Sequence, residues 1–200
     1  QFLAHASGRF GYGVLDAATR AGALPLALHP VMTFTGTTID LARLDGTPFG
    51  VTAPDELRPV AEALVVEMGG EPVWVEEGNR TLYHAALAHG SNHLMTLVGQ
   101  TLELLTLAGV QEPARLVAPL LSASLDNALR YGDQVLTGPV ARGDARTVSA
   151  HLDALRADVQ VMDTYRALAR ATADRALAAG VLRPQAAESL LDVLSERNSR

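Results

Sequence analysis

The sequence predicts an α/β domain followed by an all-helical domain. Over residues 1–76, short apolar runs alternate with segments of helical periodicity, which is the pattern of a partial parallel sheet whose strands are joined by helices. From residue 77 onward the apolar residues recur at helical spacing, and the strand pattern is absent. We therefore expect one domain at residues 1–76 and a second at residues 77–200.

Four strands are predicted in the first domain, because four short apolar runs are bounded by glycine, proline or polar turn residues. Asp55 is expected to cap one of the helices between them, and Gly69 follows the end of that helix. The predicted strands are residues 2–5, 24–28, 49–52 and 72–75, and the predicted helices are residues 13–20 and 55–68.

Five helices are predicted in the second domain. The first is long and contains Gly90 and Gly99, which a helix tolerates at some cost in stability. Pro113 and Pro184 suit the first turn of a helix, and Asp144 suits an N-cap. The predicted helices are residues 82–107, 113–131, 145–156, 159–179 and 184–197, with a loop at residues 132–143.

The composition is that of an ordinary globular protein and excludes several kinds of chemistry. Of the 200 residues, 48% are apolar and 19% are charged. No apolar run reaches the roughly 18 residues of a membrane span and no signal-peptide pattern is present, so we expect a cytoplasmic protein with no membrane partner. The chain has no cysteine, which excludes thiolate catalysis and cysteine-bound metals. A net charge of −6 argues against a nucleic-acid partner. All 16 basic residues are arginine, which excludes catalysis by a lysine.

Two polar loops follow predicted strands, at residues 5–8 and residues 29–34. In open α/β sheets, ligands bind outside the carboxyl ends of the strands. His29 is therefore a candidate functional residue.

A second group of candidates lies on the long helix. At 100° per residue, His84, Ser91 and Asn92 fall within about 100° of one another, and the small Ala88 lies between them. An imidazole exchanges a proton near neutral pH, and hydroxyl and carboxamide groups can hold a substrate oxygen. This stripe is either a catalytic face or a polar stripe covered by the neighbouring domain or by a second subunit.

Three other side chains are candidate ligands. His89 and His93 are four residues apart, which suits a metal, but no third ligand accompanies them. We expect these two to be surface residues and expect no metal site. Arg142 either clamps a substrate carboxylate through its planar guanidinium or faces solvent.

Four motifs, taken in order, resemble those of one family. They are residues 5–8, His29-Pro30 with Phe34, residues 83–86 with 91–93, and residues 136–139 leading into residues 142–144. Together they are similar to the Rossmann-like family called domain of unknown function 2520, within the 6-phosphogluconate dehydrogenase superfamily. The resemblance implies a Rossmann-like domain that binds NADP, a helical domain of the 6-phosphogluconate dehydrogenase type and an oxidoreductase activity.

Two looser likenesses suggest roles for single residues. The His29 turn is similar to a loop of prephenate dehydrogenases, in which a histidine and a preceding serine, here Ser7, contact the reacting hydroxyl. The loop from Gly138 to Asp144 resembles a segment of ketopantoate reductases that closes over a small keto acid, although His84 would have to replace their lysine. These likenesses imply catalytic roles for His84, His29, Ser7 and Asn92, cofactor binding by His5, Ser7, Gly8 and Pro30, and substrate binding by Phe34, Ser91, Thr137 and Arg142.

The glycine turn of a dinucleotide-binding domain has no full counterpart in the sequence. That turn reads Gly-x-Gly-x-x-Gly after a long apolar strand. Gly11 and Gly13 are the nearest match, without the third glycine and without that strand. We therefore expect the nucleotide-binding half of the sheet to be missing from this chain.

The long helix carries apolar residues on more than one face, so it must be covered nearly all round. We expect a homodimer with a mainly apolar interface.

The function favoured by these observations is an NADP-dependent oxidoreductase of a small keto or hydroxy acid, similar to ketopantoate reductases. A prephenate or arogenate dehydrogenase is one alternative. A non-catalytic dimerisation or ligand-binding module is another. The physiological substrate, the preference for NADP or NAD, and the choice of His29 or His84 as the acid or base stay open.

The missing glycine turn predicts that the 200-residue chain binds NADPH weakly or not at all, because no helix N-terminus receives the pyrophosphate. Isothermal titration calorimetry measures this affinity. A dissociation constant in the low micromolar range would contradict the expectation.

Overall fold

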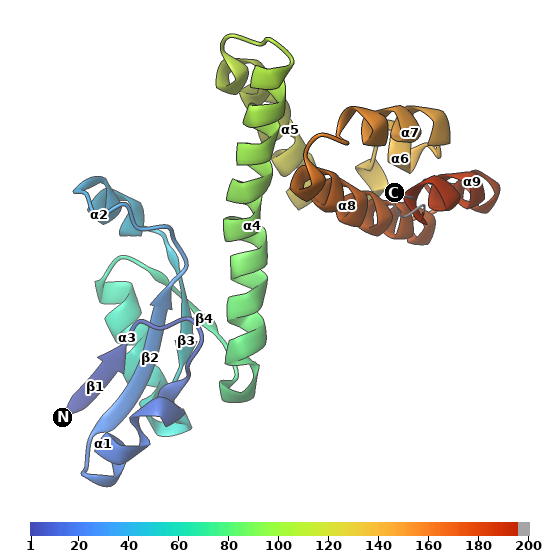
Figure 1. Ribbon diagram of the computed structural model, residues 1–200. Coiled ribbons are helices and arrows are strands. Elements are labelled where there is room, and N and C mark those ends of the chain that lie inside the picture. Colours follow the sequence, from blue (N-terminus) through green and yellow to red (C-terminus); the bar gives the residue numbers. More distant parts are fainter. Residues whose placement is uncertain (196–200) are drawn as a thin grey trace. The chain divides into compact units, whose positions relative to one another are not determined.

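The computed structural model of the protein describes residues 1–195 and confirms a sheet followed by helices. The chain forms two compact units, Gln1–Val98 and Gly99–Arg200, and the division falls within the long helix α4 (Arg80–Leu107). Figure 1 shows the elements of both units in chain order. The domain boundary predicted after residue 76 lies between the last strand and α4, and its role as a functional boundary stays a prediction.

The sheet has four strands in the order of the sequence: β1 (Phe2–His5), β2 (Leu24–Pro30), β3 (Pro48–Thr52) and β4 (Glu71–Trp74). The pairs β1–β2 and β3–β4 are parallel as expected, but β2 and β3 are antiparallel, so the sheet is mixed. The physical reason lies in residues 31–47, which contain only the short helix α2 (Ile39–Leu44) and reverse the chain direction. A parallel pair needs a crossover, usually through a full helix packed on the sheet.

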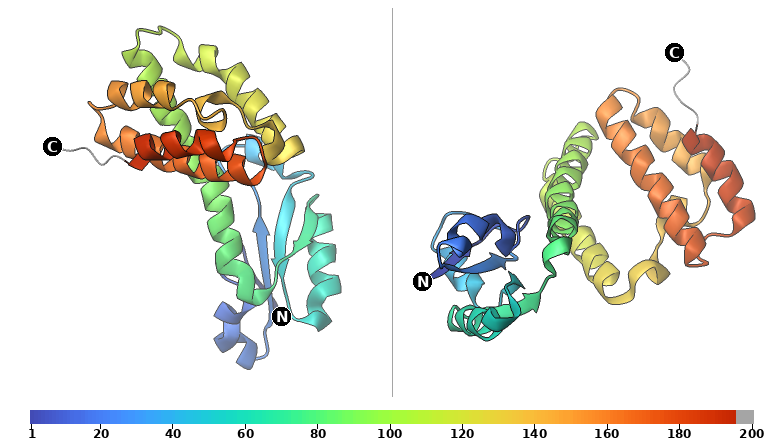
Figure 2. Two further views of the ribbon diagram at one scale, coloured as in Figure 1. Left: turned by 90° about the vertical axis from the view of Figure 1, so that its right-hand side faces the viewer. Right: turned by 90° about the horizontal axis from the view of Figure 1, so that it is seen from below.

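Alternation along the strands gives the sheet two different faces. Figure 2 shows α3 (Arg58–Glu67) and the first turns of α4 on opposite sides of the sheet. On the α3 side lies an apolar core made by Leu26, Leu28, Phe49, Val51, Ala61 and Val65. The alternate positions, which include His29 and Gly50, therefore face α4.

Most predicted boundaries in the first unit are confirmed to within a few residues, and the differences have local causes. β2 continues beyond residue 28 because His29 and Pro30 still pair with β3. The predicted helix at residues 13–20 is a 3₁₀ turn, Tyr12–Leu15, continued by α1 (Asp16–Arg20). Asp55 is not an N-cap: it opens a 3₁₀ turn, Asp55–Leu57, ahead of α3, and no side chain caps that helix.

The second unit is helical in the part of it that the structure describes. α5 begins and ends as predicted, and the expected loop at residues 132–143 contains two short helical turns. The Asp144 carboxylate caps α7 by accepting hydrogen bonds from the backbone and hydroxyl of Thr147, which confirms the predicted N-cap. The predicted end of the last helix at Arg197 lies outside the described residues. The elements are α5 (Pro113–Tyr131), the 3₁₀ turn Gly132–Val135, α6 (Gly138–Ala141), α7 (Ala145–Ala154), α8 (Val159–Ala178) and α9 (Pro184–Ser195).

The core of the second unit is formed by α6, α7, α8 and α9. Val148, Leu190 and Leu194 are fully buried in it, and Leu104 of α4 packs against it. Across residues 1–195, no helix has the length and apolarity that crossing a membrane requires.

A buried arginine fastens the first turn of α4 to the sheet. Arg80 is only 2% exposed. Its Nη2 donates hydrogen bonds to the carbonyl oxygens of Ala27 and Gly50, each at 3.0 Å, and its Nε donates to the Thr52 hydroxyl at 2.8 Å. These acceptors lie on β2 and β3, so one guanidinium ties both strands to the helix. Its third nitrogen, Nη1, is buried and makes no hydrogen bond within residues 1–195.

We predict that Arg80→Lys lowers the free energy of unfolding of the first unit by about 3 kcal/mol, because hydrogen bonds to charged groups are strong and the three donors of an ammonium group share one nitrogen. They cannot reproduce the bonds that the planar guanidinium makes from two nitrogens, Nε and Nη2. Urea denaturation followed by the fluorescence of Trp74, the one tryptophan, reports on this unit. Arg20→Lys, at an exposed position, is the matched control and should change the value by less than about 0.5 kcal/mol. Equal stability of the two variants would contradict the anchoring role.

Candidate active site

His29 stands near the carboxyl end of β2, on the face that α4 covers. Its Nδ1 lies 2.8 Å from the hydroxyl oxygen of Tyr83, and the two rings meet edge to face with centroids 5.7 Å apart. Directly across the ladder from His29 lies Gly50. A Cβ at Gly50 would collide with the Tyr83 hydroxyl, so the absence of a side chain there admits the phenol beside His29.

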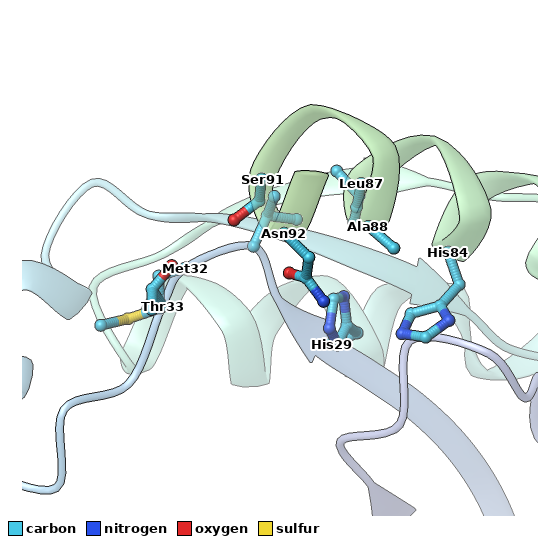
Figure 3. A pocket seen from close by; sticks show the side chains of 9 residues that line it. His29, Met32, Thr33, His84, Leu87, Ala88, Ser91 and Asn92 are labelled. Carbon is cyan, nitrogen blue, oxygen red and sulfur yellow. The ribbon is translucent and has the colours of Figure 1, made fainter. Parts of the chain in front are cut away.

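His84 follows Tyr83 on α4 and is brought to the same place. The imidazole centroids of His29 and His84 are 6.4 Å apart, with ring planes at 81°. Figure 3 shows His84 and Asn92 extending from α4 toward His29, with Ser91 on the side of Met32 and Thr33. His84 is exposed, and both histidines border one open cavity of about 330 Å³, whose lining is His29, Val31, Met32, Thr33, His84, Leu87, Ala88, Ser91 and Asn92.

The backbone at Gly8 lies against both imidazoles. A Cβ at this position would be 2.7 Å from Cδ2 of His84 and 2.9 Å from Nε2 of His29, closer than side-chain atoms pack. Gly8 is buried and its φ angle is not positive, so glycine is required here for space rather than for backbone conformation. The loop after β1 therefore closes one side of the histidine pair.

The electrostatic surroundings of His29 favour its neutral form. Burial lowers the pKa of His29 below its usual value of 6.5, and the electrostatic influence of Arg80 and then of neighbouring His84 lowers this pKa further. Arg80 remains a cation at neutral pH because guanidinium groups do not lose their proton in proteins. His29 is thus an uncharged imidazole near neutral pH.

His5 organises the loop that carries Ser7 and Gly8. Its Nδ1 accepts a hydrogen bond from the backbone N–H of Ser7 at 3.2 Å, so the ring proton is on Nε2, which donates to the carbonyl oxygen of Gly11 at 2.9 Å. Both ring nitrogens are engaged within the loop. His5 therefore has no free ring nitrogen for the predicted contact with a cofactor.

The glycine turn at Gly11 and Gly13 already holds an anionic group. The two carboxylate oxygens of Glu77 accept hydrogen bonds from the backbone N–H groups of Tyr12 and Gly13, at 2.9 and 3.0 Å. A Cβ at Gly11 would collide with this carboxylate. Glu77 thus occupies the N–H groups that a phosphate would otherwise use at this turn.

Phe34 lies on the loop that follows β2 and is 57% exposed. Asp40 of α2 shapes that loop: its carboxylate accepts hydrogen bonds from the backbone of Thr35 and Gly36 and from the Thr35 hydroxyl. These hydrogen bonds, above all the one from the Thr35 backbone, lower the pKa of Asp40. Neighbouring Thr33 lines the cavity, but Phe34 itself does not.

Other predicted residues lie outside this group. Pro30 ends β2 next to His29. Thr137 and Arg142 belong to the second unit, flanking α6, and their part in substrate binding stays a prediction. His89 and His93 are exposed on α4, with their Nδ1 atoms 3.0 Å apart.

Sequence reasoning missed Tyr83, Arg80 and Gly50 as parts of the site. Arg80 and Tyr83 precede His84 on α4 by four residues and by one, and residues 80, 83, 84, 87 and 91 share one helix face. Extending the polar stripe by one turn toward the N-terminus would have found the first two. Nothing in the local sequence distinguishes Gly50.

The chain belongs to the family described as domain of unknown function (DUF2520), which matches residues 47–172. Residues 1–30 match a Rossmann-like domain. Among proteins with a curated description, none matches. The suspected family is therefore confirmed, and the sheet and its loops belong to a Rossmann-like fold.

Two solved structures share the fold. One is protein TM1727 from Thermotoga maritima, with a TM-score of 0.73 and 23% identity over 88% of this chain and 69% of that one. The other is named "putative NADP oxidoreductase BF3122" from Bacteroides fragilis, with a TM-score of 0.71 and 20% identity over 86% of this chain and 65% of that one. This chain thus spans about two thirds of the length of each.

We predict that the His29 imidazole titrates below pH 6.5 in the folded protein, because burial and Arg80 oppose its protonation. An NMR pH titration of the ring protons measures the midpoint. In the unfolded chain His29 takes up its proton near its usual pKa of 6.5, which is a higher pH than in the folded protein. The stability that the neutral ring contributes is therefore fully present above pH 6.5 and is lost as the pH falls from 6.5 to the folded-state pKa. A midpoint at or above 6.5 would contradict the burial of this ring beside a cation.

Proposed function

We propose that this protein is an NADP-dependent oxidoreductase of a small keto or hydroxy acid, with His29 and His84 acting at the reacting oxygen. The observation that carries the proposal is the convergence of two imidazoles, 6.4 Å apart, on one cavity beside the backbone of Gly8. A cavity of about 330 Å³ suits a small ligand.

The lining residues supply the functions that carbonyl reduction needs. Negative charge develops on the substrate oxygen, which calls for a hydrogen-bond donor and for a group that exchanges a proton near neutral pH. His29 and His84 are the two candidates for these roles. The Ser91 hydroxyl and the Asn92 carboxamide line the same cavity and can hold the polar groups of the substrate.

Ser7, Gly8 and Pro30 flank His29 on the loop after β1 and at the end of β2, and they would hold the nicotinamide beside the cavity. The space next to Gly8 itself is filled by the rings of His29 and His84. When bound, NADPH supplies a hydride. The turn at Tyr12 and Gly13 does not fit the phosphates, because Glu77 already fills it.

We also infer a homodimer in solution. Leu82, Met95 and Leu107 on α4 are 71%, 73% and 81% exposed, and Leu129 on α5 is 80% exposed. Large apolar side chains exposed along two helices favour burial against a second copy. Multi-angle light scattering at micromolar concentration should give twice the mass of one chain, and a stable mass of 21.1 kDa would refute the dimer.

We predict that His84→Asn lowers turnover of NADPH-dependent keto-acid reduction by about 100-fold and leaves NADPH affinity nearly unchanged, as for a group that acts mainly in the transition state. The assay follows NADPH absorbance with a panel of small keto acids, in a form of the protein that binds NADPH. His89→Asn, on the same helix outside the cavity, is the control and should retain activity. Full activity of His84→Asn would move the acid or base role to His29, and no reduction of any acid by the parent protein would refute the proposed activity.

A further inference from the structure

The Tyr83 hydroxyl has one hydrogen-bond partner among residues 1–195, and that partner is Nδ1 of His29 at 2.8 Å. The phenol is half-buried, fills the space above Gly50 and lies near the Arg80 guanidinium, whose carbon is 5.6 Å from the ring centroid. Its position is therefore fixed from the strand side by Gly50 and from its own helix by the anchored Arg80.

The direction of this hydrogen bond follows from the two groups involved. Burial raises the pKa of Tyr83, so its oxygen keeps the proton. Since His29 Nδ1 is its one hydrogen-bond partner within residues 1–195 and leaving a half-buried donor unpaired costs free energy, the O–H donates to this nitrogen. A neutral imidazole carries one proton, which must then be on Nε2.

The nitrogen that carries this proton is the one beside Gly8. A Cβ at Gly8 would lie 2.9 Å from Nε2, whereas Nδ1 is the atom that meets the phenol. His29 thus turns its N–H away from Tyr83 and toward the side of the site where Gly8 and His84 meet it.

We propose that Tyr83 is a positioning residue that fixes His29 in the Nε2–H tautomer and so makes it a hydrogen-bond donor to the substrate oxygen. This inference rests on the proposed function, and it assigns the proton exchange to His84. A neutral imidazole acting as a donor polarises a carbonyl without taking up a proton. Tyr83 itself acts only through His29.

The chain contains a natural control for this arrangement. In the second unit, Nδ1 of His151 lies 2.9 Å from the Tyr165 hydroxyl, with ring centroids 5.8 Å apart and ring planes at 85°. The pair repeats the geometry of His29 and Tyr83, but neither residue lines the cavity. A change at Tyr165 therefore reports the effect of the same hydrogen bond outside the site.

The test measures the tautomer of His29 by long-range 1H–15N correlation on protein labelled at its histidines, with the resonances assigned by their loss in His29→Asn. We expect Nε2 protonated and Nδ1 unprotonated in the parent protein at pH 8. In Tyr83→Phe, which keeps the ring above Gly50 but removes the hydroxyl, the Nδ1–H tautomer should become detectable. Tyr165→Phe should change only the His151 resonances.

Kinetics supply the second readout. In the form of the protein that binds NADPH, Tyr83→Phe should lower kcat about tenfold with little change in KM, the effect of losing one orienting hydrogen bond. In the same form Tyr165→Phe should leave kcat unchanged. A parent His29 with its proton on Nδ1, or an unchanged tautomer and kcat in Tyr83→Phe, would overturn the inference. The expected tautomers in a protein that reduces no keto acid would support the positioning by Tyr83 and refute the proposed reaction instead.

Discussion

The guanidinium of Arg80 is the contact on which the geometry of the site depends. It joins the carbonyls of Ala27 and Gly50 and the hydroxyl of Thr52 to the first turn of α4. Because a helix is stiff over a few turns, fixing Arg80 also fixes the residues one turn later, which are Tyr83 and His84. Burial opposes protonation of His29, and the same buried charge opposes it further, so the anchor places both histidines and helps to keep His29 neutral.

Two glycines provide the space that this geometry requires. Gly50 leaves room for the phenol of Tyr83, and Gly8 leaves room for the rings of His29 and His84. In both places the glycine faces a side chain from a different element, and neither has the positive φ angle that would explain it by conformation alone. Close approach of backbone to side chain is therefore how strand, loop and helix meet at one cavity.

The sequence was sufficient for most elements because they depend on local patterns. The bounds of β1 and α5 follow from apolar runs and from Pro113, and the cap at Asp144 follows from side-chain chemistry. The antiparallel pairing of β2 and β3 was not predictable, because strand direction is decided by how the chain returns to the sheet. The site was predictable only in part, because His29 and His84 were candidates but their neighbours were not. The hydrogen bond between His29 and Tyr83 joins residues 54 apart, so no local pattern predicts it. The burial of Arg80 was not predicted because arginine is usually exposed.

The most direct test of this account is the detection of nuclear Overhauser effects from the α-protons of Gly8 to the ring protons at Cε1 of His29 and Cδ2 of His84. These two carbons would lie 3.0 and 2.7 Å from a Cβ at Gly8, so both effects should be strong in the parent protein. In Arg80→Lys the effect to His84 should weaken or vanish while the one to His29, which lies on the sheet, persists. The absence of either effect in the parent protein, or an undiminished effect to His84 in Arg80→Lys, would contradict the claim that Arg80 brings the two histidines together.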